Sequence, residues 1–513
     1  MNMKKIRMLT LAAGLCTLAG FPSSLHAQQR PNIIFIYADD LGYGDVSCYG
    51  MKRIQTPNID RLARQGVRFT NGYATSATCT PSRYGILTGR YPWRQQNTGI
   101  APGDAALIIP RDHKTLPGML QDAGYQTAVI GKWHLGIGEP GTTIDWNADL
   151  KPGPLEVGFN YAYIMPATLD RVPCVFVENH RVAGLDPADP ITVSYKHKVG
   201  NDPTGKENPE KLRMRTDPRQ GHDQTIVDSI SRIGWMSGGN NARWKDENIA
   251  GIITQKAIDF MGKNKSQPFF IYFASGDIHV PRYPNSQFRG KSGMGLRGDA
   301  ILQLDWTVGQ LTHALDSLGL TKNTMIIFSS DNGPVLNDGY LDQAAELVGS
   351  HKPGGPLRGG KYSSFEAGAR VPLIVKWPAG IAKPAVSDAL IGQVDFFASL
   401  AKLTGQPLAD GDAPDSFDML QQLLGKSRQD RPYLITQGGP LSIIEGDYKY
   451  ITPSKGARVA ADVNIELGND PGPQLYNIRK DVFEKNNLAE KDAARANAMA
   501  EKLKAVKAAG SSR

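Results

Sequence analysis

The fold class is decided by residues 32–42, which read NIIFIYADDLG. The first seven residues form a continuous apolar, largely β-branched run, which is typical of a parallel strand buried on both faces. The run stops at Asp39 and Asp40, which are followed by Leu41 and Gly42. Such a polar, glycine-bearing segment is expected where a strand reaches a loop. The stretch therefore predicts a central strand of an α/β sheet, with two carboxylates at its carboxyl end.

Similar apolar runs recur along the chain, at residues 127–130, 269–273, 325–328 and 373–375. Patterns typical of helices lie between them, for example at residues 56–63. Strands that alternate with helices predict a parallel sheet with helices on both faces. We therefore expect a catalytic α/β domain at 28–409, followed by a smaller α+β subdomain at 410–513, where the strand-like pieces are shorter and the end is rich in helix.

The segment from about residue 139 to 248 is rich in proline, glycine and charged residues and has weak periodicity. This pattern predicts a long insertion outside the sheet. Long ordered loops at the ligand-binding edge of a domain usually set its specificity, so we expect the insertion to select the substrate.

Residues 1–27 have the layout of a secretory signal peptide: three basic residues, a short apolar run and the small-residue end Leu25-His26-Ala27. A membrane anchor is the alternative, but glycines and a proline interrupt the apolar run, and no later segment is apolar and long enough to span a bilayer. We therefore expect an exported protein of the periplasm, the cell surface or the medium, without stable membrane insertion.

Composition and charge narrow the class of ligand. The chain has 513 residues, 40% hydrophobic and 21% charged, as in an ordinary globular enzyme. The formal net charge is +8, and the first 27 residues contribute three of these charges. The remaining mild charge is interspersed with acidic segments, which disfavours nucleic-acid binding and is compatible with a small anionic substrate.

Polar residues follow four of the predicted strands where each strand ends. Ligands of open α/β sheets bind beyond the carboxyl ends of the strands, so these residues predict one shared site. The four groups are Asp39-Asp40, Lys132-Trp133-His134, Asp277-Ile278-His279 and Asp331-Asn332.

Four of these residues, Asp39, Asp40, Asp331 and Asn332, offer only hard oxygen ligands, which suit Ca²⁺ or Mg²⁺. Ligation by as many as four side chains favours Ca²⁺, because its larger coordination shell tolerates it. Each pair alone could equally be a turn or a helix cap. Together, three crowded carboxylates repel each other, and this repulsion predicts a metal between them.

The cysteines raise a separate question, because Cys48, Cys79 and Cys174 remain once Cys16 leaves with the signal peptide. An odd number in an exported protein indicates either a free thiol or a cysteine that performs chemistry. Residues 79–90, CTPSRYGILTGR, predict a loop that enters a helix, with Cys79 at the helix N-terminus, where an anion is favoured. The alternative is an inert core cysteine.

This twelve-residue run resembles the signature of the type I sulfatases. In that family a maturation enzyme reads the cysteine, the proline and the arginine, here Cys79, Pro81 and Arg83, and converts the cysteine to formylglycine. The resemblance extends to residues 32–40, 131–134, 277–279, 330–333, 360–361, 366–370, 475–478 and 487–489. It implies the alkaline-phosphatase-like fold, whose large mixed sheet is mostly parallel and is sandwiched by helices.

The resemblance also implies a Ca²⁺ ion held by Asp39, Asp40, Asp331 and Asn332, with the modified Cys79 completing the shell. A thiol would leave a thiosulfate ester that needs separate hydrolysis, whereas an aldehyde hydrate carries one hydroxyl that attacks sulfur and a second that expels sulfate.

The same resemblance implies roles for the basic residues. Lys132 and Lys361 would neutralise the sulfate oxygens, and Arg83 would hold the hydrate. His279 would protonate the departing alcohol, and His134 would assist the hydrate. For each histidine alone, a structural imidazole is the alternative.

Five polar or aromatic residues of the insertion are candidates for sugar binding. The segment 163–171 is similar to sulfatases that remove 6-linked sulfate from galactose or N-acetylgalactosamine, so we expect a sulfated carbohydrate of glycosaminoglycan or mucin type as substrate. Alternatives are a phosphodiester or phosphonate monoester hydrolase of the same superfamily, and a non-catalytic sulfated-glycan-binding protein. Loop packing is the alternative reading of the five residues, which are Asp170, Arg171, His180, His222 and Trp244.

Overall fold

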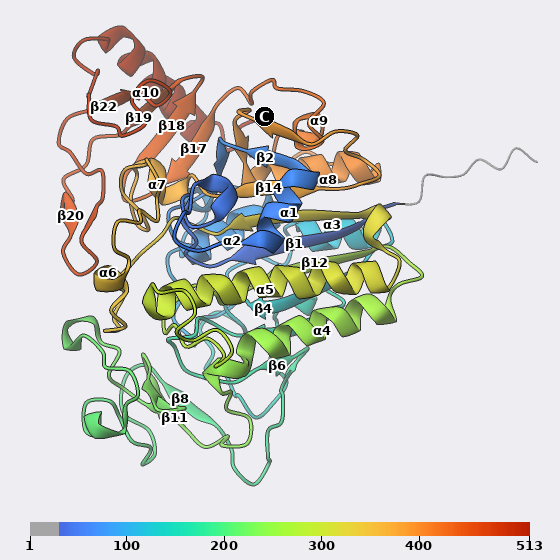
Figure 1. Ribbon diagram of the computed structural model, residues 1–513, viewed down its shortest axis with the longest axis vertical. Coiled ribbons are helices and arrows are strands. Elements are labelled where there is room, and N and C mark those ends of the chain that lie inside the picture. Colours follow the sequence, from blue (N-terminus) through green and yellow to red (C-terminus); the bar gives the residue numbers. More distant parts are fainter. Residues whose placement is uncertain (1–29) are drawn as a thin grey trace, which may run out of the picture.

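A ten-stranded mixed sheet forms the centre of the computed structural model, which describes residues 30–513 (Figure 1). From one edge to the other, the strand order is β15-β2-β14-β13-β1-β12-β4-β5-β6-β7. The predicted α/β class is confirmed. The strands are β1 (Asn32–Ala38), β2 (Val67–Phe69), β4 (Gln126–Lys132), β5 (Tyr161–Met165), β6 (Val177–Glu178), β7 (Arg181–Val182), β12 (Phe269–Ala274), β13 (Thr324–Ser330), β14 (Leu373–Lys376) and β15 (Ala385–Ser387).

The five central strands, β13, β1, β12, β4 and β5, are all parallel. Strand β1 is buried along its whole length, and its Ile34 lies between Ile326 of β13 and Ile271 of β12. A strand with neighbours on both sides and helices on both faces has no solvent-facing side, so the positions after Asn32 are apolar or aromatic. This is why the sequence of β1 shows a continuous run and no alternation.

Strand β14 corrects one expectation. Its apolar run at residues 373–375 resembled the parallel strands, but it is antiparallel to β13 and pairs Val375 with Ile327. A short buried strand reads the same in both directions, so the sequence does not reveal its orientation. The carboxyl end of β14 therefore points away from the edge at which β1 and β13 end.

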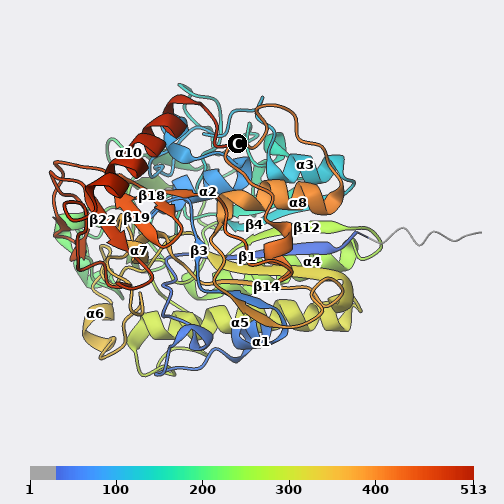
Figure 2. The same cartoon turned by 90° about the horizontal axis from the view of Figure 1, so that it is seen from above.

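Helices cover both faces of the sheet, which confirms the predicted sandwich (Figures 1 and 2). Helices α4 (Ile249–Lys263) and α1 (Pro57–Gln65) both pack on the long helix α5 (Gly295–Ser317) on one face. On the other face, α2 (Cys79–Thr88), α3 (Leu116–Asp122) and α8 (Phe396–Thr404) contact one another.

A separate four-stranded antiparallel sheet lies in the C-terminal part, in the order β17-β18-β19-β22. Its strands are β17 (Leu434–Gln437), β18 (Leu441–Glu445), β19 (Tyr448–Ile451) and β22 (Gln474–Asn477), and helix α10 (Ala493–Ala508) packs on β18 and β19. This sheet begins after the boundary that we predicted at residue 410. The preceding helix α9 (Leu420–Leu423) packs on α8 and belongs to the core of the larger domain.

The segment 139–248 is not wholly outside the sheet, which corrects our expectation. It supplies β5, β6 and β7 to the edge of the large sheet. Five apolar residues in β5 carry too little periodicity to stand out between prolines and glycines. The rest of the segment forms small two-stranded pieces, β8 (Thr192–Ser194) with β11 (Trp235–Ser237) and β9 (Ile226–Val227) with β10 (Ile230–Ser231).

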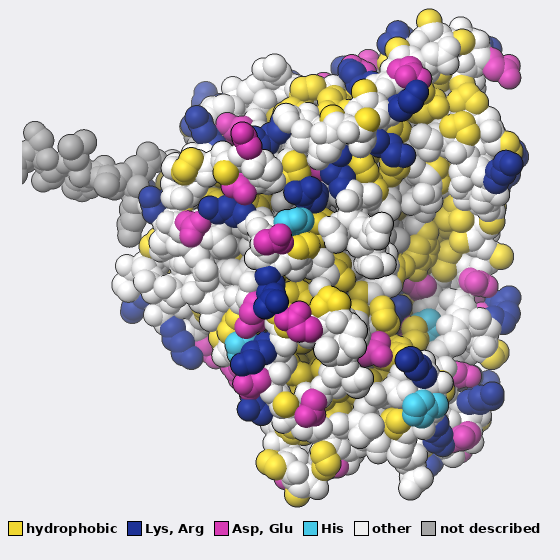
Figure 3. All heavy atoms as spheres, turned by 180° about the vertical axis from the view of Figure 1, so that it is seen from behind, with side chains coloured by type: hydrophobic (Ala, Val, Ile, Leu, Met, Phe, Trp, Pro, Cys, Tyr) yellow, Lys and Arg dark blue, Asp and Glu magenta, His cyan; other side chains and the backbone are white. Residues whose placement is uncertain are grey.

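Two lobes therefore flank the sheet edge: the C-terminal subdomain and the part of the insertion around β8 and β11 (Figure 1). The space-filling view from behind shows the surface hollowed between them (Figure 3). The remaining short elements are β3 (Gly72–Tyr73), β16 (Ile391–Gly392), β20 (Val459–Ala460), β21 (Ile465–Glu466), α6 (Ala344–Leu347) and α7 (Glu366–Ala369).

The predicted signal peptide, residues 1–27, lies outside the described residues. Across residues 30–513, none of the helices combines the length and the apolar character that a membrane span requires. Within the same range Cys48, Cys79 and Cys174 are all free thiols, with Cys79 and Cys174 buried.

Candidate active site

Four neighbouring strands, β13, β1, β12 and β4, end at the same edge of the sheet, because they are adjacent and parallel. The residues at and after these ends meet there and are all buried. They are Asp39 and Asp40 after β1, Lys132 at the end of β4, His279 after β12, and Asp331 and Asn332 after β13.

Three carboxylates of the site are each paired with a buried cation from another segment. These pairs already offset much of the repulsion between the carboxylates, so repulsion alone does not require a metal. The pairs are Lys132 Nζ with Asp39 Oδ2 at 2.6 Å, Lys361 Nζ with Asp40 Oδ2 at 3.0 Å, and Arg83 Nη2 with Asp331 Oδ2 at 2.7 Å.

The pKa values of the two adjacent aspartates are nevertheless shifted in opposite directions. Burial, together with the nearby charge of Asp331, raises the pKa of Asp39 well above its ordinary value. At Asp40 burial acts in the same direction, but Lys361, together with Lys132 and the hydrogen bond from Asn332, outweighs it and lowers the pKa below its ordinary value. One carboxylate of the pair is thus still short of positive charge.

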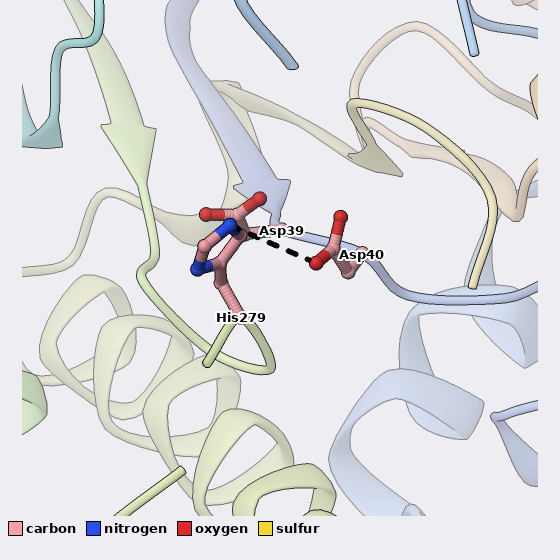
Figure 4. A group of neighbouring side chains, drawn as sticks. All are labelled: Asp39, Asp40 and His279. Carbon is pink, nitrogen blue, oxygen red and sulfur yellow. Dashed lines mark ion pairs between the residues drawn. The ribbon is translucent and has the colours of Figure 1, made fainter. Parts of the chain in front are cut away.

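Within the group Asp39, Asp40, Asp331 and Asn332, two buried oxygens have no hydrogen-bond partner among residues 30–513: Asp39 Oδ1 and Asn332 Oδ1. Buried polar atoms are rarely left unpaired in proteins, and oxygens of this type are ligands of hard divalent cations. Ligand atoms of Asp39, Asp40 and His279 lie within 4.8 Å of one another and could hold a metal ion (Figure 4). The residues at this sheet edge therefore fit a divalent cation.

Cys79 is the first residue of α2 and is buried. All ten residues of this helix are buried, and Cys79 lies close enough to the charged residues of the site for their charges to act on its thiol. Burial raises the pKa of the Cys79 thiol, and the nearby Lys132 and Lys361 act against that rise. Arg83, one turn later, reaches across to Asp331 and lies over the ring of Tyr37. The position of Cys79 at the start of α2 thus places residue 79 beside the carboxylates of Asp39 and Asp331.

His279 has a defined tautomer. Its Nδ1 lies 2.6 Å from the carbonyl oxygen of Val280, so Nδ1 carries the proton and donates it there. Its Nε2 faces the site, 3.9 Å from Asp40 Oδ2 (Figure 4). Burial and the charges of Lys361 and Lys132 lower the pKa of this imidazole to about 4. At neutral pH His279 is therefore uncharged, and its Nε2 is free to accept a proton.

His134 is held in a similar way from the other side. Its Nε2 donates to the carbonyl oxygen of Ala101 at 2.9 Å, and Nδ1 has no partner in the described part of the chain. Burial and Lys132 lower the pKa of His134 well below its ordinary value. A neutral imidazole with a free acceptor nitrogen can take a proton from a neighbouring hydroxyl.

A family model described as Sulfatase matches residues 31–406, which include every residue of this site. The chain belongs to the sulfatase family. It is a sulfuric ester hydrolase, as predicted, and a purely glycan-binding role is not supported.

Among the relatives of this sulfatase is the N-acetylgalactosamine-6-O-sulfatase of Bacteroides thetaiotaomicron, 54% identical over 508 residues, or 98% of this chain and 99% of the relative. Human arylsulfatase A is 32% identical, and the match covers 94% of this chain and 86% of that protein. A solved structure concerned with glycosaminoglycan metabolism by B. thetaiotaomicron has a TM-score of 0.92 and 55% identity, and the match covers 94% of this chain and 100% of that chain.

The phosphonate monoester hydrolase of Agrobacterium radiobacter is also similar in structure to this sulfatase, with a TM-score of 0.59. The match covers 94% of this chain and 96% of that chain, but the identity is 18%, so it concerns the fold alone. The expected alkaline-phosphatase-like fold is confirmed by the sulfatase structure with a TM-score of 0.92. The likeness to the hydrolase shows that the fold by itself does not distinguish sulfate from phosphate chemistry.

Three of the five residues that we predicted for sugar binding gather beside the sulfatase site. Asp170 Oδ2 lies 3.2 Å from His222 Nε2, and Arg171 Nη1 donates to Asp170 Oδ1 at 3.1 Å. Burial raises the pKa of Asp170, but Arg171 and the hydrogen bond from His222 outweigh it and hold the pKa well below its ordinary value. The cluster is close enough for Asp170 and His279 to influence each other's pKa.

The other two residues are not brought to the site, and both expectations were wrong. His180 lies in the turn between β6 and β7, bonded to Glu156, beside the amino end of β5 and so at the opposite edge of the sheet. Trp244 is buried in the core and packs on Phe176, so its ring is not available for stacking on a sugar. A histidine can form a loop contact and a tryptophan can pack in a core as readily as either can line a binding site, so residue type alone did not distinguish these roles.

The structure adds two residues that the sequence analysis missed, Asp338 and Tyr362. Asp338 Oδ2 accepts a hydrogen bond from Lys361 Nζ at 2.9 Å, and the Tyr362 hydroxyl donates to the same carboxylate. Asp338 is followed by Gly339, and an Asp-Gly pair in a loop reads as a turn. Only the proximity of Lys361, 23 residues later, identifies Asp338 as part of the site.

Proposed function

We propose that this sulfatase removes the 6-O-sulfate of N-acetylgalactosamine or galactose in a sulfated glycan. The observation that carries the proposal is the 54% identity, over almost the whole of both chains, to a relative named N-acetylgalactosamine-6-O-sulfatase. The cluster of Asp170, Arg171 and His222 beside His279 supports it, because carboxylate, guanidinium and imidazole groups can bind the hydroxyls of a sugar whose sulfate lies over the buried cations.

We propose Ca²⁺ as the metal of the site, with Asp39, Asp40, Asp331 and Asn332 as its protein ligands. Two of their buried oxygens are without donors among residues 30–513, and all four residues offer hard oxygen atoms. A bound Ca²⁺ would polarise a hydroxyl oxygen of residue 79 and neutralise charge on the sulfate.

We further propose that Cys79 acts as formylglycine, which supplies a hydrated aldehyde as nucleophile. Burial raises the pKa of the unmodified thiol, so the thiol itself is poorly suited to act as a thiolate nucleophile. Cys79, Pro81 and Arg83 are all buried in α2, and Arg83 is bonded to Asp331. A maturation enzyme that reads these three residues must therefore act before α2 packs into the domain.

The cations around residue 79 suit the binding of a sulfate group. Lys132, Lys361 and Arg83 are buried and held by carboxylates, so they are oriented before the substrate arrives. Preorganised charges in a site that excludes water stabilise a developing negative charge strongly. We assign the two lysines to the sulfate oxygens, Arg83 to residue 79, and His134 to the proton of its hydroxyl.

We assign the protonation of the departing sugar alcohol to His279. The negative charge of the bound sulfate would raise the pKa of the imidazole, so that Nε2 takes up the proton that it later gives to the alcohol. The His279→Ala variant should lower kcat by roughly 10²- to 10⁴-fold with a sugar sulfate, because a sugar alkoxide leaves poorly without a proton. With 4-nitrophenyl sulfate the loss should be much smaller, because nitrophenolate is stable without one. Steady-state kinetics with both substrates measure the difference.

His180→Ala is the control for that variant, since His180 is an imidazole at the opposite edge of the sheet and should leave both rates unchanged. Equal losses with the two substrates would show that His279 has another task.

Residues 1–27 support the proposal that the enzyme is exported, to the periplasm, the cell surface or the medium. Sulfated glycans of the proposed type are extracellular polymers, so export would bring the enzyme to its substrate.

A panel of defined substrates tests the proposed specificity. We expect a preference of at least about 100-fold in kcat/KM for galactose 6-sulfate and N-acetylgalactosamine 6-sulfate over N-acetylgalactosamine 4-sulfate. A sugar whose sulfate is at position 4 cannot place its hydroxyls against the polar groups that bind them in the 6-sulfate. The same assays with bis(4-nitrophenyl) phosphate test the phosphodiesterase alternative. Faster hydrolysis of the phosphate diester, or of the 4-sulfate, would contradict the proposal.

A further inference from the structure

The segment that carries Lys361 is bonded at both ends to one residue of the C-terminal subdomain, Glu484. At the start of the segment, Arg358 Nη1 donates to the carbonyl oxygen of Glu484 at 2.6 Å. At its end, the backbone N–H of Glu366 donates to Glu484 Oε2 at 2.7 Å. Lys361 lies between these two contacts, so Glu484 spans the base of the loop that presents the lysine.

A buried ion cluster fixes the far end of the segment. The Lys449 ammonium, from β19, lies 3.0 Å from Glu366 Oε1 and 3.2 Å from Glu484 Oε1. Glu366 Oε2 also accepts the hydroxyl of Tyr73 at 2.6 Å, and a guanidinium nitrogen of Arg370 at 3.1 Å. The carboxylates come from both parts of the molecule, and α7, which begins at Glu366, lies where the C-terminal subdomain meets the large sheet (Figure 1).

Glu484 occupies this position at a local cost. Its φ of 47° lies in the left-handed region, which non-glycine residues rarely adopt. Its side chain is fully buried, and burial raises its pKa to about 7 although Lys449 is adjacent. Strained or costly residues persist where the surroundings hold them firmly, often close to a functional site.

The loop is also attached to the catalytic domain, since the backbone N–H groups of Lys361 and Tyr362 donate to the carbonyl oxygens of Pro334 and Ala77. Those bonds fix the path of the chain at the lysine itself. The contacts of Glu484, together with the ion pair between Arg358 and Glu466, fix the two ends. The backbone N–H of Ala367 closes the loop on the carbonyl oxygen of Arg358. Without the Glu484 side chain, Arg358 would keep its bond to the carbonyl oxygen of residue 484, but the backbone N–H of Glu366 would lose its acceptor. The end of the loop nearer to Glu366 would then be held less firmly against the subdomain.

We propose that Glu484 is a positioning residue that aims Lys361 into the sulfate site, so that the C-terminal subdomain takes part in catalysis through this loop. The proposal rests on the proposed function, in which Lys361 binds the sulfate. Glu484 does not touch the substrate; it acts by restricting where the Lys361 ammonium can lie between Asp40 and Asp338.

A double-mutant cycle of Glu484→Ala and Lys361→Ala tests the proposal. Glu484→Ala should lower kcat/KM by roughly 10- to 100-fold, in line with the cost of misplacing a catalytic group by about 1 Å. In the Lys361→Ala background the same change should cost less than about 3-fold, because the lysine that it positions is absent. The affinity for inorganic sulfate, measured as a Kd in both backgrounds, should follow the same pattern.

Rescue and control variants separate positioning from general stability. Glu484→Gln keeps an oxygen that accepts the Glu366 N–H and should recover most of the activity. Glu445→Gln removes a carboxylate of the same subdomain that pairs with Lys502, and it should leave kcat/KM unchanged. Thermal unfolding is measured for every variant. If Glu484→Ala does not fold, Arg358→Ala breaks the other contact and takes its place in the cycle.

Equal losses in both backgrounds, or no loss from Glu484→Ala while Lys361→Ala is impaired, would overturn the positioning role alone. An unimpaired Lys361→Ala variant would instead overturn the assignment of Lys361 to the sulfate, on which the proposal rests.

Discussion

The Cys79→Ala variant should lose turnover by at least about 10⁴-fold, because removing a covalent nucleophile leaves only the contribution of binding and electrostatics. The fold should survive, since alanine fits the first turn of α2 and the bond from Arg83 to Asp331 does not involve residue 79. Release of sulfate from N-acetylgalactosamine 6-sulfate measures the loss, and thermal unfolding verifies the fold.

The control is Cys48→Ala, which replaces a half-buried free thiol outside the site and should keep full activity. Mass analysis of the peptide around residue 79 in the parent protein shows whether the cysteine has become an aldehyde. A Cys79→Ala protein with full turnover would refute the nucleophile, whereas retained binding of the sulfated sugar would not.

Removal of the metal should lower turnover almost as much as the Cys79→Ala substitution. Treatment with a Ca²⁺ chelator should lower kcat by at least about 10³-fold, because the cation neutralises negative charge on the sulfate oxygens. A factor of 10³ corresponds to about 4 kcal/mol of transition-state stabilisation. Turnover should return with added Ca²⁺, and less completely with Mg²⁺, whose smaller octahedral shell fits several protein carboxylates poorly.

The same prediction can be tested without turnover. Ca²⁺ should raise the Tm of the inactive Cys79→Ala protein, because an ion that binds only the folded state stabilises it. Asn332→Ala removes one of the orphaned oxygens and should raise the Ca²⁺ concentration needed for this shift by roughly 10- to 100-fold.

Asn264→Ala, just after the end of α4, is the matched control and should leave the Ca²⁺ dependence unchanged. If Ca²⁺ has no effect on the Tm of the Cys79→Ala protein, the proposed ligand set is wrong.

Much of the site follows from the sequence because it depends on two general rules. A strand buried on both faces must be apolar throughout, and the carboxyl ends of adjacent parallel strands lie at one edge of the sheet. Residues that directly follow such strands, such as Asp39 after β1 and Asp331 after β13, are therefore predictable neighbours although they lie far apart in the sequence. Cys79 was recognisable from its own segment, through its place at a helix N-terminus and its family signature.

The sequence by itself thus determined the α/β sandwich, the edge at which the site lies and the charged residues delivered there by strand ends. Only the tertiary structure decided which loop residues join them: Asp338 and the Asp170 cluster lie at the site, whereas His180 and Trp244 do not. The contact of Glu484 with the Lys361 loop was likewise visible only in three dimensions. The physical reason is that a strand end has one direction set by its sheet, whereas a loop takes its path from packing with distant segments, and residue type alone does not encode that path.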